Sequence, residues 1–147
     1  MTWKNLRAQD RVELHVTSKA ELDDLRRAIA RNLGDAGLKE LSADNRFSIA
    51  YQAALLAAKM AIACAGYRVK GHAAHQTTFQ ALKLALGSGV HKTADYLDRC
   101  RRKRNDLAYD SEGVVSAADS AELFKEAKAL HRDVEAWIAK HHPKLAR

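Results

Sequence analysis

The chain has 147 residues, a length that favours a single domain with a buried core. Its 25 Lys and Arg residues exceed its 18 Asp and Glu residues and give a formal net charge of +7, which attracts polyanions such as nucleic acid without selecting one. The two cysteines, Cys64 and Cys100, do not form a CxxC pair. They indicate a reducing compartment rather than a disulfide framework, so we expect a cytoplasmic protein.

The composition favours helices and argues against a membrane or exported protein. The most apolar stretch, Ala53–Ala65, is shorter than the roughly 20 residues that a membrane helix needs, and it contains Lys59. Lys4 and Arg7 stand where a signal peptide has its apolar segment, so export is not indicated. A single proline, Pro143, and many alanines leave the chain free to form long helices. We therefore expect an all-α fold.

The first segment, residues 1–17, is expected to be an arm that packs on a helical bundle. Val12, Leu14 and Val16 alternate with polar residues, as they would in a strand. A strand needs a partner, however, and we expect none in an otherwise helical chain. The arm is therefore not predicted to form a sheet.

Capping residues and apolar repeats predict five helices. Ser18 and Glu21 form a capping-box pattern that starts the first helix at about Lys19, and Gly34 and Gly37 end it. The next helix is apolar over most of its circumference, so it should lie at the centre of the fold. We expect the other four helices at Ser42 to Ala65, Gly71 to Leu86, Val90 to Leu107 and Ser116 to Lys140. Together they predict an up-and-down bundle over residues 18–142, within one domain that spans residues 1–147.

The basic segment Arg99–Asp110 carries the candidate site. Residues four apart lie about 40° apart around a helix, so Arg101, Asn105 and Tyr109 fall in one row, whereas Arg104 lies about 140° from Tyr109. Guanidinium and amide groups together suit phosphate oxygens, so the row predicts a site for a phosphate-bearing ligand. The alternative is a solvated basic helix that ends in a packed tyrosine.

The end of this segment resembles the signature of the HEPN superfamily, small helical-bundle domains that share the motif Arg-Asn, three variable residues and His. Residues 104–108 (Arg-Asn-Asp-Leu-Ala) match the first five positions, late in the penultimate helix. Tyr109 stands at the sixth position in place of His. The helix order and the segment Ser42–Tyr51, which leads into an Ala-rich central helix, are also similar to a bacterial branch of the superfamily. The resemblance covers most of the chain from Ser18 onward.

The resemblance implies an RNA-related function. Many HEPN proteins are metal-independent ribonucleases, including toxins of toxin–antitoxin pairs, which act as homodimers with two motifs in one cleft. By this resemblance Arg104 binds the scissile phosphate, Asn105 orients the substrate, and Tyr109 occupies the position of the residue that takes the proton of the ribose 2′-hydroxyl. Further phosphate or RNA contacts are expected from Arg101, Arg102 and Lys103. No metal or other cofactor is implied.

Tyr109 is the point at which this chain departs from the motif. A tyrosine with its ordinary pKa near 10 is a poor general base at neutral pH, and nearby arginines lower that pKa by stabilising the phenolate. Two alternatives therefore stay open. The chain is either a non-catalytic binding or scaffold module that retains the Arg and the Asn, or the partner of a nucleotidyltransferase, which in some HEPN pairs modifies a tyrosine near the motif. Tyr109 would then be the modified residue.

The other histidines offer weaker candidates. His91 begins the motif helix, far along it from Tyr109. His72 and His75 are three residues apart and could bind a metal with Cys64 or His91, because a site needs three or four converging ligands. The alternative for the pair is an ordinary polar start of a helix.

Overall fold

The computed structural model describes the backbone of residues 1–109 and 115–147, and the side chains of the same residues except 107–109. The described chain contains α1 (Trp3–Ala8), β1 (Val12–Leu14), α2 (Lys19–Ala36), α3 (Ala43–Cys64), β2 (Tyr67–Val69), α4 (Ala74–Leu86), α5 (His91–Tyr109) and α6 (Ala117–His141), with short 3₁₀ turns at Ser88–Val90 and Pro143–Leu145. The expected all-α bundle is confirmed, and the five long helices are those that the sequence predicts.

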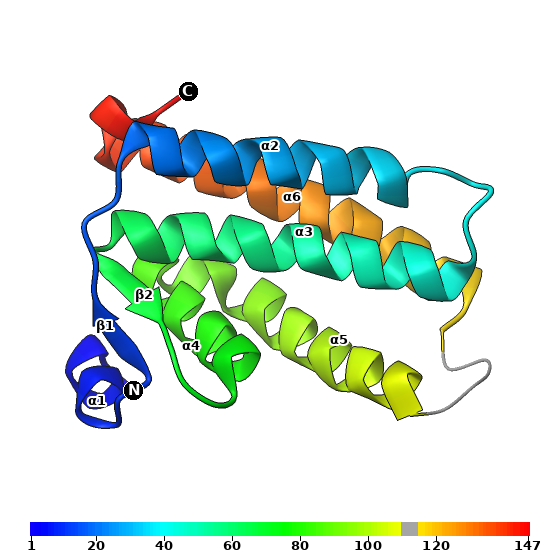
Figure 1. The fold of residues 1–147 in the computed structure, drawn as a ribbon, viewed down its shortest axis with the longest axis horizontal. Coiled ribbons are helices and arrows are strands. Elements are labelled where there is room, and N and C mark those ends of the chain that lie inside the picture. Colours follow the sequence, from blue (N-terminus) through cyan, green and yellow to red (C-terminus); the bar gives the residue numbers. More distant parts are fainter. Residues whose placement is uncertain (110–114) are drawn as a thin grey trace.

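Helix α3 lies at the centre of the bundle, between α2 and α6 on one side and α4 and α5 on the other (Figure 1). Thirteen of its residues are buried, and seven of these are alanines. Small side chains let neighbouring helices approach closely, whereas Phe47, Tyr51 and Met60 fill the wider gaps. By length and composition α3 could cross a membrane, but 72% of its most apolar stretch is buried inside the protein. It is the core helix of the bundle.

Serine caps start three of the helices, as the sequence predicts. Ser18, Ser42 and Ser116 each accept a hydrogen bond from the backbone N–H three residues later. The capping box is complete only at Ser116, because the carboxylate of Glu21 contacts His15 Nε2 at 2.8 Å instead of the backbone of Ser18. The Ser18 cap therefore provides one of the two bonds that the pattern predicts.

The amino-terminal arm differs from the expectation. Residues 3–8 form α1, and Val12–Leu14 pairs antiparallel with Tyr67–Val69, so that Val12 lies opposite Val69. The partner strand was missed because it is only three residues long and directly follows α3, where Gly66 with φ of 96° turns the chain back. The ring of Trp3 stacks on Tyr67 at 4.1 Å, which fixes α1 against this hairpin.

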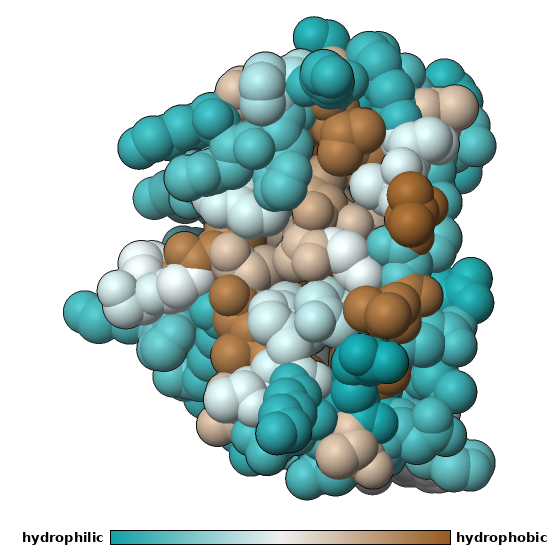
Figure 2. Space-filling view, turned by 90° about the vertical axis from the view of Figure 1, so that its left-hand side faces the viewer, coloured by the Kyte–Doolittle hydropathy of each residue, from teal (hydrophilic) through white to brown (hydrophobic). Residues whose placement is uncertain are grey.

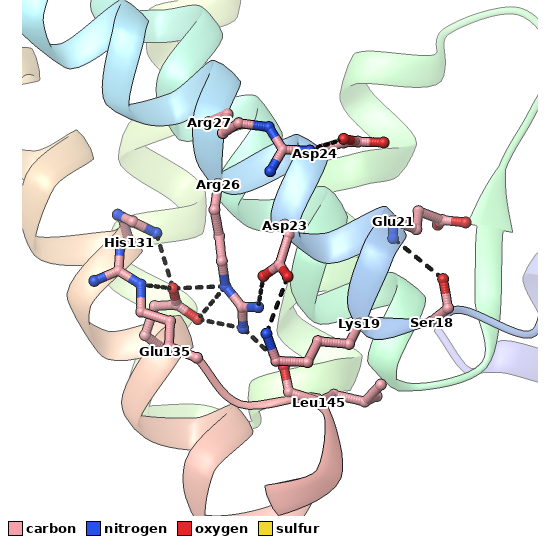
Figure 3. A network of polar contacts seen from close by, with 11 residues as sticks. Ser18, Lys19, Glu21, Asp23, Asp24, Arg26, Arg27, His131, Glu135 and Leu145 are labelled. Carbon is pink, nitrogen blue, oxygen red and sulfur yellow. Dashed lines mark hydrogen bonds and ion pairs between the residues drawn. The ribbon is translucent and has the colours of Figure 1, made fainter.

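A buried ionic network joins α2, α6 and the carboxyl-terminal residues (Figure 3). Arg26 is 6% exposed, and its guanidinium donates to both carboxylate oxygens of Glu135, with a shortest distance of 2.9 Å. It also donates to Asp23 at 2.7 Å and to the carbonyl of Leu145 at 2.9 Å. Arg147 reaches the same Glu135 carboxylate at 2.7 Å. The end of the chain is thus tied to the far side of the bundle from α5.

Candidate phosphate-binding site

Helix α5 turns one stripe toward the bundle and a basic surface toward α4. Ala94, Leu97 and Cys100 are buried at intervals of three residues, as in an amphipathic helix. Arg101 and Arg104 each lie about 40° around the helix from a residue of this stripe, because they follow Leu97 and Cys100 by four positions. Both arginines are therefore half-buried at the edge of the helix contact. Helix α4 runs beside this edge (Figure 1).

Three of the predicted site residues share one pocket. The pocket has a volume of about 250 Å³ and is lined by Ala73, Ala74, His75, Gln76, Arg101, Arg104 and Asn105. Arg101 donates from Nε to Asp98 Oδ1 at 2.8 Å, so part of its charge is already compensated. No described acidic residue pairs with Arg104, whose guanidinium carbon lies 5.0 Å from the centre of the Tyr51 ring. The Arg104 cation is held by this aromatic contact and remains free to meet an anion.

The wall of the pocket opposite the arginines is the start of α4. Ala73 occupies the N-cap position with φ of 57° and provides no side-chain hydrogen bond to the first turn. The first backbone N–H groups of a helix have no partner within the helix, and they carry the positive end of its dipole. Here they lie in the same pocket wall as His75 and Gln76. The pocket therefore combines two guanidinium groups with an uncapped helix start.

His75 reaches this pocket from α4 and is anchored by Tyr51. Tyr51 Oη and His75 Nδ1 are 3.0 Å apart, and the Tyr51 side chain is fully buried. Burial raises the pKa of Tyr51 despite the nearby Arg104 and Arg101, so its hydroxyl keeps its proton. Burial, followed by the positive charges of Arg104, Lys59 and Arg101, lowers the pKa of His75 below its ordinary value. His75 is therefore a neutral imidazole at neutral pH.

The rest of the basic segment faces elsewhere. Lys103 donates to Asp119 at 3.0 Å and lies against α6, beside Cys100 and Glu122. Arg102 is exposed and does not line the pocket. The structure thus brings Arg101, Arg104 and Asn105 together and leaves Arg102 and Lys103 outside. Phosphate or RNA contacts by these two residues stay a prediction.

Tyr109 is the last residue of α5, and its side chain lies outside the described part of the structure. The expected row of Arg101, Asn105 and Tyr109 is therefore seen only for its first two members, which both line the pocket. Arg104 joins them without a bend in the helix, because positions three apart also lie on neighbouring faces. Its relation to Tyr109 stays a prediction.

His75 is the residue whose role at the site the sequence did not indicate. It was weighed only as a metal ligand with His72, and Tyr51 only as a core residue. No local pattern links Tyr51, His75 and Arg104, which come from three helices and meet only in the folded chain. His72 is exposed and does not line the pocket. Among the described residues, His, Cys, Asp and Glu side chains do not gather in a group of three that could hold a metal ion.

A second pocket, of about 340 Å³, lies at the hairpin end of the molecule and has a different character. Its walls include the apolar side chains of Leu25, Ile62 and Val69, and polar residues surround them. Figure 2 shows this end of the molecule, where hydrophobic surface in the middle is framed by hydrophilic residues. An apolar surface does not attract phosphate, so the smaller pocket between α4 and α5 is the candidate site.

Comparison with known proteins found no matching family model, no similar curated protein and no similar solved structure. The HEPN assignment therefore depends on the motif at residues 104–108 and on the helix order.

Proposed function

We propose that this protein is an HEPN-like RNA-binding protein whose ligand phosphate occupies the pocket between α4 and α5. The observation that carries the proposal is that Arg101, Arg104 and Asn105 line one pocket with the uncapped start of α4. Each of these groups offers hydrogen-bond donors to an anion, and a helix start adds the positive end of its dipole. Arg104 has no described acidic partner that a ligand would need to displace.

A phosphate of RNA suits this pocket better than a carboxylate metabolite does. The net charge of +7 draws polyanions to the whole surface, which strengthens the encounter with a chain of phosphates. The pocket is open to solvent, so a phosphate can enter while the rest of a strand continues over the exposed Arg102 and Asn105. Asn105 supplies both a donor and an acceptor, which a ribose hydroxyl can use.

Within the HEPN resemblance, the finer proposal is a metal-independent ribonuclease of toxin–antitoxin type that acts as a homodimer. Its rival is a binding or scaffold module that retains the arginine and the asparagine without cleaving RNA. Both need the pocket to bind RNA. Incubation of the bound RNA with the protein in EDTA separates them, because only the ribonuclease converts it to shorter fragments.

Binding is tested by fluorescence anisotropy with a short labelled single-stranded RNA over a series of salt concentrations. Arg104→Ala should weaken binding about 10- to 100-fold, since a hydrogen bond to a charged group contributes about 1.5–3 kcal/mol. It should also reduce the salt slope by about 0.7, the value for one phosphate contact on a single strand. Arg31→Ala is the matched control, because Arg31 is an exposed arginine on α2, across α3 from the pocket.

Equal affinities for Arg104→Ala and Arg31→Ala would contradict the proposal. That result would mean that RNA meets only the general positive field of the surface. Absence of salt-dependent binding to the unmodified protein would contradict it as well.

A further inference from the structure

We propose that His75 is the general base of this site, which takes the proton of the ribose 2′-hydroxyl in place of the histidine that the motif lacks. The inference rests on the proposed binding of RNA in the pocket. It assigns the chemistry to a residue of α4, far in the sequence from residues 104–109. The structure brings His75 to the arginines through Tyr51, which contacts both His75 and Arg104.

The ring of His75 is held by one edge and open at the other. Nδ1 lies 3.0 Å from the buried Tyr51 hydroxyl. Nε2, on the opposite edge, forms no hydrogen bond with any described residue, and the side chain lines the pocket. The free nitrogen therefore faces away from Tyr51, on the side where a ligand bound by Arg101 and Arg104 would lie.

Tyr51 sets the state of the ring. A base at Nε2 needs the proton on Nδ1, and the Tyr51 oxygen is placed to accept that N–H. The same contact stabilises the imidazolium after proton uptake, because Nδ1–H then continues to donate to Tyr51. The reverse tautomer, with Tyr51 donating to Nδ1, would present Nε2–H to the phosphate and make His75 a binding group only. The two states predict different effects of substitution.

The surrounding charges favour proton acceptance over permanent protonation. The groups that act on His75 are Arg101 and Arg104 from α5 and Lys59 from α3, all of them cations. Together with burial they keep the imidazole neutral at neutral pH, as a general base must be. A bound phosphate would offset these cations, so the imidazolium formed during the reaction is less costly than in the empty pocket.

The reaction that this arrangement supports is transfer of the phosphodiester to the neighbouring 2′-oxygen. Nε2 takes the 2′-hydroxyl proton, and O2′ forms a bond to phosphorus. The bond from phosphorus to O5′ breaks, and the 5′-oxygen takes a proton from water. His75 then returns its proton to solvent. The products are a 2′,3′-cyclic phosphate and a 5′-hydroxyl, and neither a metal nor a redox step is needed. Arg101 and Arg104 are placed to stabilise the charge that builds on the phosphate oxygens.

The experiment measures binding and cleavage of the same labelled RNA, in EDTA, for the unmodified protein and three variants. His75→Asn places an amide near the position of Nδ1, so it keeps a partner for Tyr51 and removes Nε2. His75→Ala removes the whole ring. His72→Ala is the matched control, because His72 lies on the same side of α4, is exposed and does not line the pocket.

Both His75 variants should bind RNA within about threefold of the unmodified protein, and they should cleave it about 10²- to 10⁴-fold more slowly, the usual contribution of a general base. Added imidazole should partly restore cleavage in His75→Ala, and His72→Ala should behave like the unmodified protein. Fragments should end in a 2′,3′-cyclic phosphate. Circular dichroism of each variant confirms that it is folded.

Three results would overturn the inference. Cleavage that His75→Asn leaves unchanged would place the base elsewhere, and a parallel loss of binding and cleavage would make His75 a phosphate contact. RNA that the unmodified protein binds but does not cleave would also overturn it, while leaving the proposed RNA binding intact. RNA that is not bound at all would overturn both.

Discussion

Replacement of Arg26 by leucine should destabilise the protein through the ionic network that joins α2 and α6. In this network the guanidinium of Arg26 makes two of its contacts to Glu135, one to Asp23 and one to the carbonyl of Leu145. Leucine satisfies none of them. Glu135, whose side chain is 15% exposed, would keep only Arg147 and the more distant His131 as charged neighbours.

The size of the effect follows from burial. Breaking a buried ion pair by removing one partner costs about 3–5 kcal/mol, because the remaining charge stays in a poorly solvated position. Arg147 still neutralises Glu135 in the variant, so we expect the lower end of this range, about 3 kcal/mol. For a chain of this size the melting temperature should fall by roughly 6–12 °C. The double variant Arg26→Leu with Glu135→Leu should recover most of the loss, since two apolar side chains leave no buried charge unpaired.

Chemical denaturation measures these differences in the free energy of unfolding. Lys19→Ala is the control, because the Lys19–Asp23 pair lies on the same helix at 3.0 Å but is largely exposed, and its loss should cost less than about 0.5 kcal/mol. A loss below about 1 kcal/mol in Arg26→Leu, or no recovery in the double variant, would refute the reasoning.

The same network predicts how stability depends on pH. Burial alone would raise the pKa of Glu135, but the hydrogen bonds and charge of Arg26, with Arg147, outweigh it, so the pKa is lowered in the folded state. A carboxyl group with a lowered pKa stabilises the fold above its unfolded value, near 4.3, and loses this contribution as the pH falls through the folded value. Arg26→Leu should therefore lose stability less steeply in acid than the unmodified protein does.

Two further predictions concern the core and the turns. Burial raises the pKa of the Cys64 and Cys100 thiols to about 11, so both should react slowly with a disulfide reagent in the native protein and rapidly in denaturant; fast native labelling would contradict their burial. Gly66 has φ of 96°, so Gly66→Ala should destabilise by about 1 kcal/mol, whereas Gly34→Ala within α2, where a Cβ meets no atom within 4 Å, should stabilise by about 0.5–1 kcal/mol in denaturant titrations. Effects of equal sign would refute the assignment of these backbone positions.

Local sequence signals were sufficient for the helices. Serine caps and apolar repeats place the starts of α2, α3 and α6 correctly because capping and amphipathic spacing act over a few neighbouring residues. The near-continuous apolar surface of α3 likewise predicts its central position. The hairpin could not be predicted in this way, since each three-residue strand is stable only through the other, and 50 or more residues separate them in the chain.

The candidate site divides in the same manner. The sequence by itself determined the fold class, the positive charge and the presence of Arg101, Arg104 and Asn105 on one helix, because these depend on composition and helical periodicity. Only the tertiary structure decided that Arg104 rests on Tyr51, that Tyr51 holds His75, and that Lys103 turns away to Asp119. The physical reason is that a pocket forms between elements: α3 positions the two aromatic contacts, and the packing of α4 beside α5 brings together side chains that no local pattern relates.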